Sequence, residues 1–328
     1  MKKINTLFNQ INKLKVGVIG DVMLDTYNWG KVERISPEAP IPIVSLQRKE
    51  HRIGGAGNVA LNCTSLGAQV FVLTVLGADH EAKILEKLYT EQKINTKYLV
   101  KSKKRITTTK TRIISRNQQM LRLDSENSND LFLKEENELI EKVKKFIQIE
   151  KPDVLIFEDY NKGVLTEKII STSIELCKKA GVITAVDPKR KNFFNYGGVD
   201  IFKPNFKEAK DALHLQSDKV DLSTLESIHT SINKILGNRI SLITLSENGV
   251  FWQLGKQSKI LPCILRNIAD VSGAGDTVIA TATLFYAVTK NIAIAAAIAN
   301  IAGGLVCEEV GTASISKEKL LKECRALK

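Results

Sequence analysis

Short apolar runs rich in β-branched residues alternate along most of this chain with stretches that carry helical signals. Val16–Gly20 and Asp153–Phe157 are two such runs, and the second is followed by a helical stretch over Thr166–Ala180 that stops at Gly181. Strands that alternate with helices pair in parallel, because each helix carries the chain back to the same edge of the sheet. The sequence therefore predicts an α/β fold with a mostly parallel central sheet.

Two segments break this rhythm. Ile41–Leu46 and Thr107–Asp124 alternate apolar and polar residues with no helix between them, which is typical of antiparallel strands with one face in water. We expect a small β-sheet lid, formed by segments at about 25–50 and 105–124. The lid would be inserted into a single domain that spans residues 1–328.

The formal net charge of +12 raises the question of nucleic-acid binding. The excess is mostly lysine spread over the whole chain, and no basic motif interleaved with aromatic residues accompanies it. We therefore expect no nucleic-acid partner, and we interpret the charge as a solvated surface that also favours anionic substrates.

The compartment follows from two further features. The start of the chain has no apolar signal-peptide core, and the most apolar stretch, 278–306, is interrupted by polar residues and predicts a buried helix pair. The five cysteines form no CxxC pair and their number is odd, which suits reduced thiols. We expect a cytoplasmic protein with no membrane contact.

The strongest chemical signal is Gly273-Ala274-Gly275-Asp276, directly before a helix expected from about Thr277. Small residues let the backbone approach a ligand, and N–H groups at the positive end of a helix can hold a phosphate. Asp276 can accept a proton from an attacking hydroxyl group. A plain glycine-rich cap, with Asp276 as the capping residue, remains an alternative, and the absence of a following lysine excludes a Walker loop.

A second set of small and polar residues follows the early strands. Gly54 and Gly55 precede another helix, in which Asn58 offers donors and acceptors to sugar hydroxyls. Asp21 and Asp25 follow the first strand, and ligands of open α/β sheets bind at the carboxyl ends of strands. The alternative for the two glycines is a tight turn before the helix, and the alternative for the two aspartates is a solvated turn.

The third signal is Asn205-Phe206-Lys207-Glu208, which follows a short strand. Asn205 and Glu208 stand one helical turn apart and face the same way. Together they can orient water around Mg²⁺, with Glu208 as the metal-site residue acting through water. The alternative is a capping box at a helix start, and both roles are compatible.

Taken in order, these motifs resemble those of the ribokinase-like carbohydrate kinases. Further runs resemble the heptose 7-phosphate kinases of lipopolysaccharide precursor synthesis; they are Gly20–Asp25, Ile35–Pro40, Ser115–Gln119, Leu121–Asp124, Asp159-Tyr160 with Lys162-Gly163, and Asp187–Lys189. The resemblance extends from about residue 14 to the end. It implies the three-layer ribokinase-like fold and ATP with Mg²⁺ as cofactors, and it leaves a monovalent cation open.

The resemblance also implies roles for matched residues. Asp276 would be the general base, and Gly273, Ala274 and Gly275 would form the anion hole. Asn205 to Glu208 would line the ATP phosphates, with Thr244, Ser246 and Gly249 bordering the nucleotide and Asn300 near the adenine. The sugar would be held by Asp21, Gly54, Gly55 and Asn58, with Asp25 as a further candidate.

The reaction implied is transfer of the ATP γ-phosphate to the anomeric hydroxyl of D-glycero-β-D-manno-heptose 7-phosphate. The phosphate already on that substrate needs a basic clamp, because charged donors bind phosphate strongly. The candidates are Lys110, Arg112, Arg116, Arg122 and Lys162; alternation along a strand lets Lys110 and Arg112, and also Arg116, converge. We also expect a homodimer formed through the lid, and a separate adenylyltransferase for the next step.

Three alternatives stay open at this point: a kinase for ribose, fructose or a related sugar, a dinucleotide-binding oxidoreductase, and a catalytically inactive sugar-binding regulator. The oxidoreductase lacks a G-x-G-x-x-G run after the first strand, and the intact Asp276 argues against the regulator. The chain departs from its relatives at Thr26, at Val271 and at Glu158, which replaces a small residue.

Overall fold

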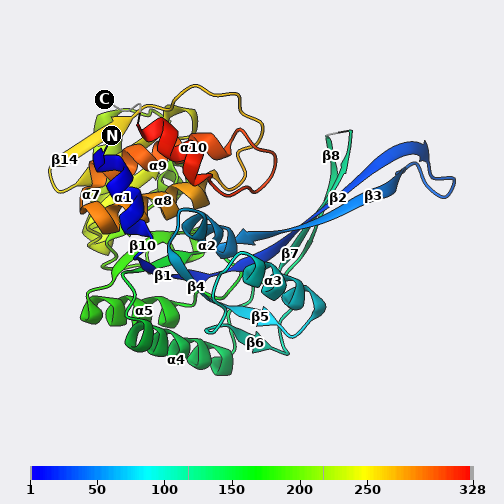
Figure 1. Ribbon diagram of the computed structural model, residues 1–328, viewed down its shortest axis with the longest axis horizontal. Coiled ribbons are helices and arrows are strands. Elements are labelled where there is room, and N and C mark those ends of the chain that lie inside the picture. The colour runs from blue at the N-terminus through cyan, green and yellow to red at the C-terminus, as the bar shows by residue number, and fades with distance from the viewer. Residues whose placement is uncertain (1, 117, 217, 326–328) are drawn as a thin grey trace.

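A sheet of eight strands forms the centre of the computed structural model (Figure 1), which describes residues 2–116, 118–216 and 218–325. The strand order is β14-β13-β12-β11-β10-β9-β1-β4. Strands β4 to β12 in this order are parallel, and β13 and β14 join them antiparallel at one edge. The prediction of a mostly parallel sheet is confirmed. The strands are β1 (Lys15–Gly20), β4 (Gln69–Leu73), β9 (Val154–Glu158), β10 (Ile183–Asp187), β11 (Ile201–Phe202), β12 (Ile240–Thr244), β13 (Val250–Leu254) and β14 (Gln257–Leu261).

Helices cover both faces of this sheet and make a three-layer fold. Alternate residues of one strand enter different cores: Val154 and Ile156 of β9 face one core, while Leu155 and Phe157 face the other. The first core also takes residues from α1 (Lys2–Ile11), α2 (Ala56–Ser65), α3 (His80–Glu91), α8 (Ala274–Thr289), α9 (Ile292–Val306) and α10 (Lys317–Cys324). The second core takes them from α4 (Leu133–Glu150), α5 (Glu167–Ala180), α6 (Phe206–Ala212) and α7 (Leu222–Leu236).

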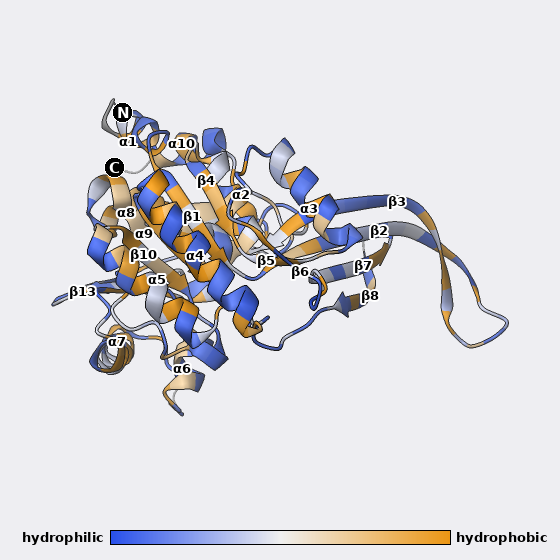
Figure 2. Cartoon of the chain, turned by 90° about the horizontal axis from the view of Figure 1, so that it is seen from below, coloured by the Kyte–Doolittle hydropathy of each residue, from blue (hydrophilic) through white to orange (hydrophobic). Residues whose placement is uncertain are grey.

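A second sheet of four strands projects from one side of the three layers (Figure 1). Its order is β3-β2-β7-β8, formed by β2 (Val22–Ile35), β3 (Pro42–Gly55), β7 (Thr109–Ser115) and β8 (Gln118–Ser125). The expected lid sheet is therefore present. Its first two strands lie within 22–55, which is longer than the expected 25–50, and its other two lie within 109–125, which begins later than the expected 105–124. The hairpin of β2 and β3 reaches well past β7 and β8 (Figure 2). A further parallel pair joins β5 (Val75–Gly77) to β6 (Val100–Ser102).

Local signals in the sequence account for several element ends. Thr166 caps α5 through its side chain, and Gly181 ends it in the left-handed conformation. The buried helix pair expected over 278–306 is α8 and α9. The amino-terminal segment, which looks polar in sequence, is an amphipathic helix with Phe8 and Ile11 buried. Within the described residues, no helix combines the length and the apolar character that crossing a membrane requires.

Candidate active site

Asp276 lies in the first turn of α8, because this helix begins at Ala274 rather than at about Thr277. Its side chain is buried and accepts two hydrogen bonds, from Asn58 Nδ2 at 2.7 Å and from the Tyr160 hydroxyl at 2.9 Å. Burial, reinforced by the charge of Asp187, raises the pKa of Asp276 to about 6, against the opposing effect of those two hydrogen bonds. A carboxylate with this pKa, held on two donors, suits the removal of a proton near neutral pH.

The glycine run before Asp276 has the conformation that the sequence requires of it. Gly273 has φ 81°, in the left-handed region, and a Cβ at this position would lie 2.8 Å from Asn58 Nδ2. Glycine therefore permits both the turn and the close approach of Asn58. The amino end of α8, at Ala274 and Gly275, presents the positive end of the helix dipole beside the Asp276 carboxylate.

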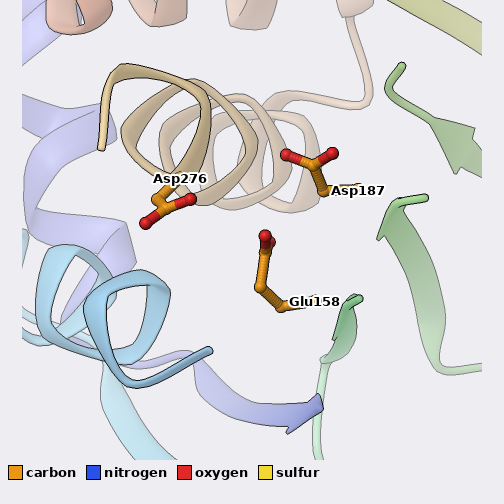
Figure 3. Close-up of side chains that lie close together, drawn as sticks. All are labelled: Glu158, Asp187 and Asp276. Carbon is orange, nitrogen blue, oxygen red and sulfur yellow. The ribbon is translucent and has the colours of Figure 1, made fainter. Parts of the chain in front are cut away.

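Two more buried carboxyl groups lie beside Asp276 and converge with it from neighbouring strands (Figure 3). Glu158 is the last residue of β9, and Asp187 is the last residue of β10. We call Glu158, Asp187 and Asp276 the acidic floor. One oxygen from each residue lies within 4.8 Å of the others. The acidic floor therefore gathers three carboxyl groups close to the amino end of α8.

Two lysines accompany the acidic floor. Lys203 Nζ lies 2.7 Å from Asp187, and Lys189 Nζ lies 3.2 Å from Asp187 and 2.6 Å from Glu208. Burial alone would raise the pKa of Asp187, but these lysines lower it below its ordinary value. Burial raises the pKa of Glu158 well above its ordinary value, and the charges of Asp187 and Asp276 add to this effect.

The two aspartates after the first strand have different surroundings. Asp21 is buried and accepts hydrogen bonds from the backbone N–H groups of Tyr160, Lys162 and Val164 at 2.9–3.0 Å. Its carboxylate therefore holds the loop after β9 in place, and the expected contact of Asp21 with sugar hydroxyls stays a prediction. Asp25 instead lies on the lid, near residues of both the lid and the carboxyl-terminal part of the chain.

Asp25 forms an ion pair with Arg112 at 2.6 Å and accepts a hydrogen bond from the Thr312 hydroxyl at 3.3 Å. A Cβ at Gly54, on the neighbouring strand, would lie 2.4 Å from Asp25 Oδ2. Gly54 is thus needed to make room for this carboxylate. Gly55 follows it directly, before α2 and Asn58. The structure brings Asp25, Gly54, Gly55 and Asn58 together between the lid and the main sheet.

Three basic side chains lie on the lid face that carries Asp25. Lys110 is paired in register with Asp25 on one side and Asp124 on the other, and Arg112 lies directly opposite Arg122. We call Lys110, Arg112 and Arg122 the lid cations. Arg112 is bound to Asp25, and Arg122 lies 2.9 Å from Asp124. Two of the three are therefore already paired.

Lys110 differs from its two neighbours. Its Nζ lies 5.8 Å from the centre of the Tyr160 ring, and it forms no hydrogen bond or ion pair with the parts of the chain described here. Burial lowers its pKa. Because Tyr160 also donates to Asp276, Lys110 lies one side chain away from the Asp276 carboxylate.

The predicted convergence is wrong for Arg116. It lies beyond the end of β7, exposed and with φ 49°, in the turn that leads to β8. The pairing of β7 with β8 is also irregular here, because Met120 of β8 lies between the partners of Ile113 and Ile114. Asn117, which belongs to the Ser115–Gln119 run, lies outside the described residues. Lys162, from the main domain, pairs with Glu126 at 2.7 Å.

The run from Asn205 to Glu208 forms the capping box that was the alternative interpretation. The Asn205 side chain accepts from the Glu208 N–H at 2.7 Å, and Glu208 accepts from the Asn205 N–H at 2.8 Å. Phe206 packs against the second core, whereas Lys207 is exposed. Glu208 contacts Lys189, which connects this helix start to the acidic floor.

The residues expected around the nucleotide lie beyond β12. Thr244 ends β12 and forms a bridge with Asn205, and Ser246 and Gly249 belong to the turn that follows, both with positive φ. Asn300, on α9, donates to the Pro262 carbonyl at 2.8 Å. The structure thus brings Asn205 and Thr244 together, while Asn300 anchors the segment after β14.

Sequence reasoning assigned no role to Tyr160, Asp187, Lys189 or Lys203. Each follows the end of a parallel strand or lies close to it, at the edge where ligands bind in open α/β sheets. That rule could have found Asp187 and Glu158 as strand-end carboxyl groups. The bond from Tyr160 to Asp276 joins residues 116 positions apart and carries no local signal.

Comparison with known proteins adds a family match. The model of the pfkB family of carbohydrate kinases matches residues 13–319. Two curated relatives are both called bifunctional protein HldE. The one from Desulfatibacillum aliphaticivorans is 38% identical over 309 residues, and the one from Geotalea uraniireducens is 36% identical over 329 residues. These matches cover 93% and 98% of this chain but only 62% and 65% of the relatives.

Solved structures agree on the fold. Phosphofructokinase-2 from Escherichia coli, in complex with substrates and products, superposes with a TM-score of 0.79 at 18% identity, over 96% of this chain and 99% of that one. Ribokinase from Arabidopsis thaliana, in complex with ribose and ATP, gives 0.73 at 18% identity, over 94% and 99%. The predicted ribokinase-like fold is confirmed.

Proposed function

Because the chain belongs to the pfkB family of carbohydrate kinases, we propose that it transfers the γ-phosphate of ATP to the anomeric hydroxyl of D-glycero-β-D-manno-heptose 7-phosphate. The product would be the 1,7-bisphosphate. Support for the sugar comes from the heptose-kinase-like runs in the sequence and from the relatives called HldE. This chain covers about two thirds of those relatives' length, so the proposal concerns the kinase reaction alone.

The observation that carries the proposal is the placement of Asp276. Its carboxylate lies at the amino end of α8, with Asn58 and Tyr160 fixing its two oxygens. In this position it would take the proton from the attacking hydroxyl, while the N–H groups at the start of α8 hold the transferring phosphoryl group. The protein's contribution would be positioning and electrostatic stabilisation, as in phosphoryl transfer generally.

Mg²⁺ fits the oxygen-rich donors beside the nucleotide segment. Glu208 uses one oxygen in the capping box and the other for Lys189, and a carboxylate oxygen so engaged still accepts a hydrogen bond from a metal-bound water. Mg²⁺ would neutralise charge on the ATP phosphates. Asn205 and Glu208 would orient its water ligands, and Thr244, Ser246, Gly249 and Asn300 would border the nucleotide.

Lys110 is the best-placed anchor for the phosphate that the substrate brings. Its Nζ lies near the Tyr160 ring, is partly desolvated and forms no hydrogen bond or ion pair with the described chain, although Asp124 and Asp25 lie close enough to act on its charge. Its ammonium group is therefore available to an anion. Arg122 and Lys162 would assist after exchanging Asp124 and Glu126 for the phosphate. Arg112 would remain on Asp25 and orient it toward the sugar hydroxyls.

The outer face of the lid supports a homodimer. Leu121 and Leu123 lie on the face opposite Lys110 and Arg112 and are 51% and 53% exposed. A second copy of the lid would cover them, because an apolar sheet face gains stability when it is removed from water. Replacing both leucines by aspartate is expected to turn a dimer into a monomer in light scattering. An unchanged mass would exclude pairing through this face.

The test of the function is a coupled ADP-release assay against a panel of sugars and sugar phosphates. We expect heptose 7-phosphate to be preferred strongly over the unphosphorylated heptose, ribose and fructose. Equal efficiency with ribose or fructose would favour the alternative, another sugar kinase of this fold. The cytoplasmic location, the monovalent cation and the separate adenylyltransferase stay predictions, for which fractionation, potassium titration and product analysis are the measurements.

A further inference from the structure

Glu158 is a buried carboxyl group that the proposed reaction does not use. Its side chain is 0% exposed, and neither carboxyl oxygen has a hydrogen-bond partner in the described chain. Burying an unpaired polar group is unfavourable by several kcal/mol if it is charged, so such a group is retained where a ligand satisfies it. The direction of this side chain therefore indicates what the ligand is.

The Glu158 carboxyl group points between the carboxyl groups of Asp187 and Asp276 (Figure 3). These three residues come from β9, β10 and α8, and no short sequence segment contains them together. Oxygens within 4.8 Å of one another have a common centre at most about 2.8 Å from each, slightly more than the Ca²⁺–oxygen distance and about 0.7 Å more than that of Mg²⁺. Small inward movements would complete a coordination shell.

Around the acidic floor the carboxyl groups outnumber the ammonium groups that contact them. Lys203 contacts Asp187, and Lys189 is shared between Asp187 and Glu208. The acidic floor and Glu208 together supply four carboxyl groups against these two ammonium groups. With all of them ionised, two negative charges remain, which is the charge that one divalent cation neutralises.

We propose that Glu158, Asp187 and Asp276 form a divalent-cation site that binds Mg²⁺ or Mn²⁺ directly, without nucleotide. All ligands would be carboxylate oxygens, which hard cations of this size prefer. The site differs from the water-mediated one at Asn205 and Glu208, which depends on ATP. It depends on the acidic floor and not on which sugar the enzyme phosphorylates.

The position of this site gives it a role in the same active centre. A Cβ at Gly275 would lie 3.5 Å from Asp187 Oδ2, so the acidic floor is in contact with the anion hole. A cation held there adds positive charge below the amino end of α8, where the transferred phosphoryl group is expected.

The test is a titration of the purified full chain with Mn²⁺, followed by electron paramagnetic resonance, without ATP or sugar. We expect one tightly bound Mn²⁺ per chain that excess Mg²⁺ displaces. Glu158→Gln, which keeps the shape of the side chain, should weaken this binding at least tenfold. The matched control is Glu135→Gln, which changes another buried carboxyl group with an unpartnered oxygen outside the acidic floor and should leave binding unchanged.

Thermal unfolding provides a second readout on the same samples. Mn²⁺ should raise the Tm of the unmodified chain and of Glu135→Gln, and it should raise that of Glu158→Gln much less, because a ligand stabilises only the state that binds it. Equal Mn²⁺ binding by Glu158→Gln, or no binding by the unmodified chain, would overturn the proposal. The proposal would also be overturned if Glu208→Gln lost nucleotide-free Mn²⁺ binding while Glu158→Gln kept it. None of these outcomes depends on the identity of the sugar.

Discussion

The acidic floor and the lid cations both approach Tyr160, through Asp276 and Lys110, but are built in opposite ways. The acidic floor is buried, its three residues stand at two strand ends and a helix start, and strands on both sides hold it. The lid cations stand on a projecting four-stranded sheet, and Arg112 and Arg122 are engaged by nearby carboxylates. A site on a packed sheet is preorganised, whereas one on a projecting lid can exchange partners when a ligand arrives.

This difference suggests a division of labour. Groups on the acidic floor should determine the rate of the chemical step, because their geometry is fixed before substrates bind. Groups on the lid should determine which substrate is held, because their ion pairs can be replaced by a substrate phosphate. Variants of the two regions are therefore expected to change kcat and KM in different proportions.

The largest effect is expected from Asp276→Asn. The amide retains the shape of the side chain but cannot accept the proton, so kcat should fall by about 10² to 10⁴. ATP binding, measured by calorimetry, should stay close to that of the unmodified enzyme. A variant with near-normal kcat would show that Asp276 is not the base. It would also contradict the assignment of the chemical step to the acidic floor.

The lid should respond through substrate choice. Lys110→Ala removes a charged donor worth roughly 1.5–3 kcal/mol, so kcat/KM for heptose 7-phosphate should fall by about 10- to 100-fold, mostly through KM. The unphosphorylated heptose should be affected far less. Arg116→Ala is the matched control, because Arg116 is exposed in the turn beyond β7. Equal losses in the two variants would contradict the assignment of the phosphate to Lys110.

The comparison also predicts a pH dependence. The pKa of Asp276 is raised to about 6, so its carboxylate form, the active one, predominates above that pH and is lost as the pH falls through it. kcat/KM should decrease about tenfold per pH unit below 6. Lys110→Ala should retain this acid limb, since the lid does not supply the base. An acid limb near pH 4 would indicate that the base is better solvated than the structure shows.

The smallest effects are expected at the start of α6, where Asn205 and Glu208 form the capping box. Asn205→Ala should lower stability by about 1 kcal/mol through loss of the cap. Both this variant and Glu208→Gln should lose several-fold in activity, with part of it returning at high Mg²⁺. If activity and its Mg²⁺ dependence are unchanged while the Tm still falls in Asn205→Ala, these residues are a capping box alone.

Much of the architecture is readable from local patterns in the sequence. Several features each depend on residues close together in the chain. They are the alternation of strands and helices, the caps of α5, the buried pair α8 and α9, and the lid strands with one face in water. The glycine before α8 is likewise a local requirement, because its left-handed backbone is needed for the turn. These features were predictable because side-chain periodicity and capping act over a few residues.

The tertiary structure alone decided which side chains meet. Sequence motifs placed Asp21 and Asp25 together after the first strand, but the strand order brings Asp21 against the backbone after β9 and places Asp25 beside Arg112 of the lid. Tyr160 reaches Asp276, and Glu158 enters the acidic floor, only because parallel pairing brings the ends of β9 and β10 to one edge, under α8. Such contacts join residues distant in the chain, and no local periodicity encodes strand order or register.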